Sequence, residues 1–96
     1  MIHHIVLFRL NDGVDEETIA EHMADFESLL DEIPEIDQLD VKRDLVGRPV
    51  SCHFGLVSQF ADMAALRRYQ QHPEHVEAFD RLKPHLQQML VLDYEG

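Results

Sequence analysis

The chain has 96 residues, 45% of them hydrophobic and 28% charged, which is enough for one globular domain and excludes an intrinsically disordered protein. Its formal net charge of −11, from 19 acidic and 8 basic residues, argues against nucleic acid and anionic membranes as partners. The single cysteine, Cys52, excludes an internal disulfide, and no segment has the length and apolarity of a membrane span, so we expect one soluble, cytoplasmic domain over residues 1–96.

The first half of the chain predicts a strand, a helix and a second strand. Residues 2–10 are apolar on both sides of an extended chain. Asp15 is a candidate cap for a helix that ends before Pro34, because the residue before a proline is pushed out of helical geometry. Residues 39–45 alternate between apolar and charged, as expected of a strand with one face in water. The predicted buried stripe of the helix consists of Ile19, Met23, Phe26, Leu29, Leu30 and Ile33.

The second half predicts a strand, two helices and a final strand. Apolar residues alternate along a strand from about Cys52 to Phe60. Asp62 is the next candidate cap, for a helix that continues to about Gln71 and is broken by the proline at position 73. A shorter helix over residues 74–82 and a strongly apolar strand over residues 89–94 complete the chain.

This order of elements predicts an α+β domain of the ferredoxin-like, split βαβ type, in which a four-stranded antiparallel sheet carries its helices on one face. The other face of such a sheet is polar in a monomer that is exposed to water. Here the first, third and last predicted strands are instead apolar on both sides. Since the chain offers no further element to cover the second face, we predict a homodimer in which two sheets pack face to face or close a barrel.

Four short motifs follow one another along the chain. They are IHHIVLF at residues 2–8, IP at 33–34, YQQHPEH at 69–75 and VLDYE at 91–95. In this order and at these separations they resemble the stress-responsive A/B barrel domain family, and the resemblance covers essentially the whole chain. It implies a dimeric α+β barrel, which the apolar strand faces predict independently.

The resemblance also implies a site. A plant polyketide cyclase of this family closes a linear poly-β-keto product by an aldol condensation, with a tyrosine and a histidine at the positions that match Tyr69 and His75. By this resemblance His75 is the candidate base and Tyr69 the candidate hydrogen-bond donor to the oxyanion, roles that an imidazole and a phenol can fill. The positions that match the lining of the cyclase pocket are His4, Val6, Phe8, Met23, Phe26, Leu86, Met89 and Val91.

The same residues also have structural interpretations. His72 can bond a backbone carbonyl left open where the second helix stops, and His75 can be satisfied by local hydrogen bonds. His4 can be a core histidine bonded to a hydroxyl or carbonyl of a neighbouring strand, and Tyr69 can belong to the core. His72 and His75 lie three residues apart, but no third ligand accompanies them at a spacing typical of metal sites, so a metal site is not expected. Haem and nucleotide cofactors are not expected either, because nothing beyond His75 suggests an axial ligand and Gly-rich phosphate loops are absent.

Two hypotheses about function follow. In the first, the protein is a cofactor-free enzyme or binding protein for a small, apolar, carbonyl-bearing molecule, such as a polyketide-like or aromatic compound. In the second, it is a non-catalytic dimeric stress or accessory protein whose pocket is filled by its own side chains. The size of the cavity separates the two, because ligand pockets measure about 300 Å³ or more.

Overall fold

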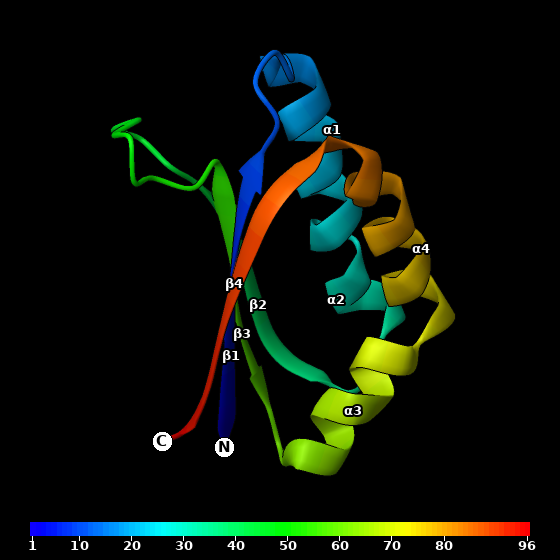
Figure 1. The fold of residues 1–96 in the computed structure, drawn as a ribbon. Coiled ribbons are helices and arrows are strands. Elements are labelled where there is room, and N and C mark those ends of the chain that lie inside the picture. The colour runs from blue at the N-terminus through cyan, green and yellow to red at the C-terminus, as the bar shows by residue number, and fades with distance from the viewer.

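The computed structural model describes residues 1–96 as a four-stranded antiparallel sheet with all helices on one face (Figure 1). The strands are β1 (Ile2–Leu10), β2 (Ile36–Arg43), β3 (Phe54–Phe60) and β4 (Leu86–Glu95), arranged in the order β2-β3-β1-β4. The helices are α1 (Glu16–Glu27), α2 (Leu29–Glu32), α3 (Met63–Gln71), α4 (Pro73–Leu82) and the 3₁₀ turn η1 (Lys83–His85). This is the ferredoxin-like α+β fold that the sequence predicts. None of its helices has the length and apolarity needed to span a membrane.

Helix starts follow the capping residues that the sequence predicts. The carboxylates of Asp15 and Asp62 each accept a 2.8 Å hydrogen bond from an amide N–H in the first turn of α1 and of α3. His72 also acts at a helix start, because its Nδ1 accepts from the Glu74 amide at 3.2 Å. The structure therefore corrects the prediction for His72: Pro73 begins α4 one residue later, so the ring caps the next helix rather than bonding a carbonyl of α3.

The core lies between the helices and the inner face of the sheet. Phe8, Phe26 and Phe54, each at most 2% exposed, pack with ring centroids 5.0–6.2 Å apart. Burying each such ring contributes about 1.5–3 kcal/mol to stability. Leu30, predicted to be buried, is half-exposed instead, because the helix is interrupted at Ser28 and the residue turns outward on α2.

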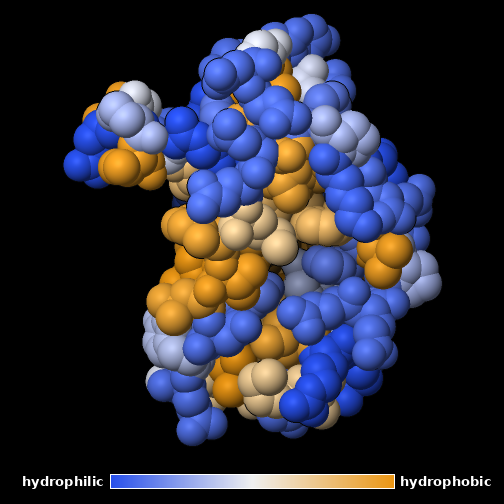
Figure 2. All heavy atoms as spheres, viewed as in Figure 1, coloured by the Kyte–Doolittle hydropathy of each residue, from blue (hydrophilic) through white to orange (hydrophobic).

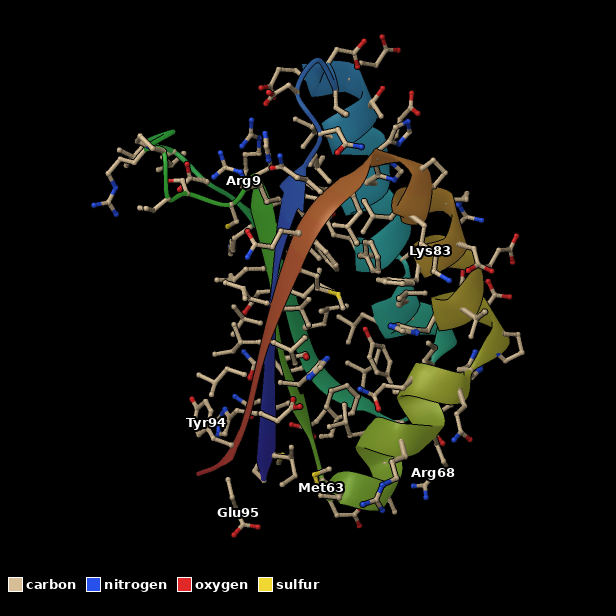
Figure 3. All side chains as sticks on the ribbon, in the orientation of Figure 1. Arg9, Met63, Arg68, Lys83, Tyr94 and Glu95 are labelled. Carbon is tan, nitrogen blue, oxygen red and sulfur yellow. The ribbon has the colours of Figure 1, made fainter.

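The outer face of the sheet carries no helix and is apolar over β1, β3 and β4. Its apolar side chains, called the open-face patch below, are Ile5, Leu7, Val57, Leu90, Leu92 and Tyr94. Figure 2 shows apolar residues gathered where β4 runs, and Figure 3 shows Tyr94 on the side away from the helices. β2 adds Asp40 and Lys42 to the same face, so the patch is displaced toward β4. Monomeric proteins rarely expose a continuous apolar surface of this kind.

Two histidines meet beside the core. His22 on α1 is 5% exposed, and its Nε2 lies 2.8 Å from Nδ1 of His85 in the η1 turn. The other ring nitrogen of His22, Nδ1, is buried without a partner. Burial lowers the pKa of His22, and so does the nearby His85, although the carboxylates of Asp25 and Glu21 oppose the shift. His22 is therefore held neutral in the folded protein.

We expect stability to decrease as the pH falls below about 6.5, because the unfolded chain then takes up a proton at His22 that the folded state resists. The loss for one such group is at most about 1.4 kcal/mol per pH unit. Urea unfolding midpoints at about pH 7.5 and pH 5.5 measure it. The variant His22→Gln, which does not titrate, should lose less stability over this range. An equal loss in both proteins would contradict the assignment.

Candidate functional site

A hollow of about 220 Å³ lies between the inner face of the sheet and the helices α3 and α4. Its lining residues are His4, Val6, Phe8, Leu56, Tyr69, Gln70, His75, Phe79, Met89 and Val91. Alternate residues of β1 form one wall, and across the strand pair Val91 lies beside Val6 and Met89 beside Phe8. Met89 and Val91 are 41% and 49% exposed because β4 is an edge strand, so this edge is the mouth of the hollow.

The junction of α3 and α4 brings Tyr69 and His75 together, with ring centroids 4.5 Å apart. Tyr69 is on the buried stripe of α3 and is 1% exposed, and its side chain lines the hollow. Burial raises the pKa of Tyr69. The hydroxyl therefore stays protonated and is available as a donor to a molecule in the hollow.

One nitrogen of His75 is already bonded and the other is free. Nδ1 lies 3.1 Å from the carbonyl oxygen of Gln70, and since a carbonyl only accepts, Nδ1 carries the hydrogen. Burial lowers the pKa of His75, as do His4 and His72, while the bond to Gln70 acts in the opposite direction. A neutral ring in this state presents the lone pair of Nε2 to the hollow. The hydrogen bond to Gln70 agrees with the structural interpretation of His75, in which local hydrogen bonds satisfy the ring. The unbonded Nε2 is also compatible with the role of a base.

His4 is the third polar group of the hollow. The residue is 4% exposed, and its Nδ1 bonds the carboxylate of Asp93, its partner across the β1–β4 pair. Because a carboxylate only accepts, Nδ1 carries the hydrogen and Nε2 is the unbonded ring atom. The partner of His4 is thus a carboxylate and not the hydroxyl or carbonyl that the sequence predicts for a core histidine. The rings of His4 and Tyr69 meet edge to face with centroids 6.2 Å apart.

Three residues that the resemblance placed in the pocket lie elsewhere. Phe26 is fully buried among the core phenylalanines, and Met23 and Leu86 pack half-buried against the core. α1 packs against β2 and α4, and none of its residues lines the hollow. Leu86 is the first residue of β4 and pairs with Leu10, beyond the end of the hollow. The other predicted site residues, His4, Val6, Phe8, Tyr69, His75, Met89 and Val91, all line it.

Four residues at the site were not predicted. Leu56 pairs with Val6, and strand alternation could have placed it on the inner face. Phe79 lies on the apolar stripe of α4 that the sequence shows. Gln70 and Asp93 carry no such signal, because their roles depend on contacts made only after folding.

The histidine pair at positions 72 and 75 does not converge on a common point. Nδ1 of His72 accepts from an amide at the start of α4, whereas Nδ1 of His75 donates toward α3. No group of three or more histidine, cysteine, aspartate or glutamate side chains is arranged so that it could hold a metal ion.

Comparison with known proteins gives a family and similar structures. The family profile described as Stress Responsive A/B Barrel Domain matches residues 2–96. A protein of Streptomyces coelicolor is 34% identical over 97 residues, covering 99% of each chain. A dimeric ferredoxin-like protein of unknown function from Bacteroides fragilis is 31% identical with a TM-score of 0.84, covering 99% of this chain and 95% of that one. Another, from Thermobifida fusca, is 27% identical with a TM-score of 0.89, covering 99% and 90%.

Proposed function

The chain belongs to the stress responsive A/B barrel domain family, and from this premise we propose that it is a homodimer whose subunits each bind a small, mostly apolar carbonyl compound without a cofactor. Fold and family alone do not name a ligand, since one fold serves many functions. The observation that carries the proposal is the set of polar groups from His4, Tyr69 and His75, which together with Gln70 interrupt a lining that is apolar elsewhere.

The polar groups define what the ligand must offer. The hydroxyl of Tyr69 donates and Nε2 of the neutral His75 accepts, so the two together suit a carbonyl oxygen next to an acidic C–H or an enol. Each hydrogen bond that a bound molecule forms with these two groups would contribute about 0.5–1.5 kcal/mol to affinity.

The volume limits the size of the ligand. About 220 Å³ is below the usual pocket size of about 300 Å³ or more. It is above the roughly 150 Å³ that suffices for benzene in an engineered apolar cavity. A single substituted ring or a short chain fits this space, and a longer chain would extend past Met89 and Val91 at the mouth.

The same geometry supports proton transfer. Nε2 of His75 takes a proton from the carbon beside a carbonyl, the C–H electron pair moves into the enolate, and the Tyr69 hydroxyl donates a hydrogen bond to the enolate oxygen. The bond between His4 and Asp93 fixes the orientation of the His4 ring against Tyr69. The alternative is a non-catalytic accessory protein, and the local bond of His75 to Gln70 together with the small volume favours it.

The dimer is supported by the open-face patch. Leu90 and Leu92, on β4, are 58% and 56% exposed, which is unfavourable for a lone subunit in water. Two sheets packed face to face would bury this surface, and about 800 Å² per subunit is typical of a stable interface. The similar proteins from Bacteroides fragilis and Thermobifida fusca, both described as dimeric, also favour this assembly.

Thermal unfolding with single-ring aromatic ketones and short 1,3-diketones, beginning with acetophenone and acetylacetone, tests the ligand. A compound at about 100 times its Kd should stabilise the protein by about 2.7 kcal/mol. Tyr69→Phe removes only the hydroxyl and should weaken binding about tenfold, and His75→Ala should do the same. His72→Asn, which keeps a cap on α4 outside the hollow, is the control and should bind normally. No shift with any compound, or equal shifts in wild type and the two site variants, would contradict the proposal.

A further inference from the structure

Residues 44–53, which connect β2 and β3, form an arm that stands out from the sheet on the side opposite the helices (Figure 1). Three aliphatic side chains of the arm are largely exposed to solvent: Leu45 is 93%, Val46 71% and Val50 85% exposed. Figure 2 shows this apolar group at the end of the arm. Single exposed apolar side chains are common on protein surfaces, but three on one protruding segment indicate a surface that binds another molecule.

The arm is held in place by polar bonds. The carboxylate of Asp44 accepts from the amide of Gly47 at 2.8 Å, and Gly47 has a φ of +70° that favours glycine. At the base, Nη1 of Arg9 donates to the carbonyl oxygens of Pro49 at 2.6 Å and Ser51 at 3.0 Å (Figure 3). The apolar side chains are therefore presented on a preorganised segment, which reduces the entropy lost on association.

The arm and the open-face patch belong to one surface. A hollow of about 420 Å³ lies between them and is lined by residues of both. The lining residues are Leu7, Arg9, Pro49, Val50, Ser51, Cys52, Gln88 and Leu90. Leu7 and Leu90 belong to the patch, while Pro49 and Val50 belong to the arm. A partner that covers the patch therefore meets the arm as well.

We propose that the arm closes over a second copy of this chain that is packed on the open-face patch. This inference rests on the homodimer proposed above and adds the segment that completes it: Leu45, Val46 and Val50 of each subunit rest on the partner. Under two-fold symmetry each arm contact occurs twice, so the two arms act together.

Charge favours a second copy as the occupant. Because each chain has a net charge of −11, two copies repel one another over most of their surfaces. The arm carries Asp44 and Arg48, whose charges cancel, and the six side chains of the patch carry none. Beside them on the same face Asp40 and Lys42 also cancel, and Arg9 adds one positive charge. The arm and the patch together are thus a surface on which like-charged copies can meet without added repulsion.

The triple variant Leu45→Ser, Val46→Ser and Val50→Ser tests the arm. Sedimentation velocity over a range of concentrations should show the Kd of the dimer raised about 10- to 100-fold, with unchanged circular dichroism. The control Leu30→Ser with Val76→Ser changes exposed aliphatic residues on the helix layer and should leave the Kd unaltered. An unchanged Kd in the arm variant would overturn the inference.

A photo-crosslinker identifies the contact directly. With Leu45→p-benzoylphenylalanine, mixed isotope-labelled and unlabelled chains should give covalent dimers that join the two labels, with the second site on the open face. Crosslinks confined to one chain would overturn the role of the arm while leaving the dimer standing. A wild-type protein that sediments as a monomer at micromolar concentration would instead overturn the dimer and the arm together.

Discussion

Replacing Leu92 by aspartate should convert the dimer to monomers, with the Kd raised at least about 1000-fold. Leu92 lies on β4 next to Ile5 in the open-face patch and is 56% exposed in the single subunit. In a symmetric dimer both copies carry the change, so two carboxylates lose water without gaining a partner. At about 2–3 kcal/mol each, their combined cost of about 4–6 kcal/mol reaches the roughly 4 kcal/mol that a 1000-fold weakening requires.

Sedimentation velocity or light scattering on a sizing column measures this change. Leu30→Asp is the matched control, because it places the same substitution at a half-exposed leucine on the helix side. The control should remain a dimer, and both variants should keep the circular dichroism of the wild type. If Leu92→Asp still assembles like the wild type, the open face is not the interface.

The sequence predicts the fold well where the deciding signal is local. The carboxylates of Asp15 and Asp62 begin helices through bonds to amides three residues ahead, which sequence spacing alone reveals. Leu45 shows the limit of such signals. Its alternation with Leu39 and Val41 predicts a strand, but β2 ends at Arg43 and Leu45 lies bare on the arm. The alternation of apolar and polar residues does not show at which residue a strand stops pairing with the neighbouring strand.

The site is predicted less completely, for a physical reason. His4, Tyr69 and His75 lie on the inner faces of elements whose periodicity is visible, and the family resemblance singles them out. Which part of the sheet each helix covers depends on tertiary packing, which the pattern of one chain does not encode. The hollow lies under α3 and α4, so Phe26 on α1 is part of the core instead. Asp93 becomes part of the site only through the register of β4 against β1.

The position of Phe26 gives a second large expected effect. Phe26→Ala should lower the free energy of unfolding by about 3–5 kcal/mol, because the ring is fully buried. Its centroid lies 5.4 Å from the ring centroid of Phe8 and 6.2 Å from that of Phe54. For a chain of this length the loss corresponds to a Tm lower by about 15–25 °C. Thermal and urea unfolding at fixed protein concentration measure it, since a dimer's apparent stability depends on concentration.

Met23→Ala, at a half-buried position on the same helix, is the control and should cost about half as much or less. If Phe26 lined the hollow instead, its removal would enlarge the ligand site, change ligand affinity and cost little stability. A large loss of stability with ketone binding retained in the fraction that remains folded would assign Phe26 to the core. The boundary of the pocket would then run along Phe8, the lining residue that Phe26 packs against from the core side.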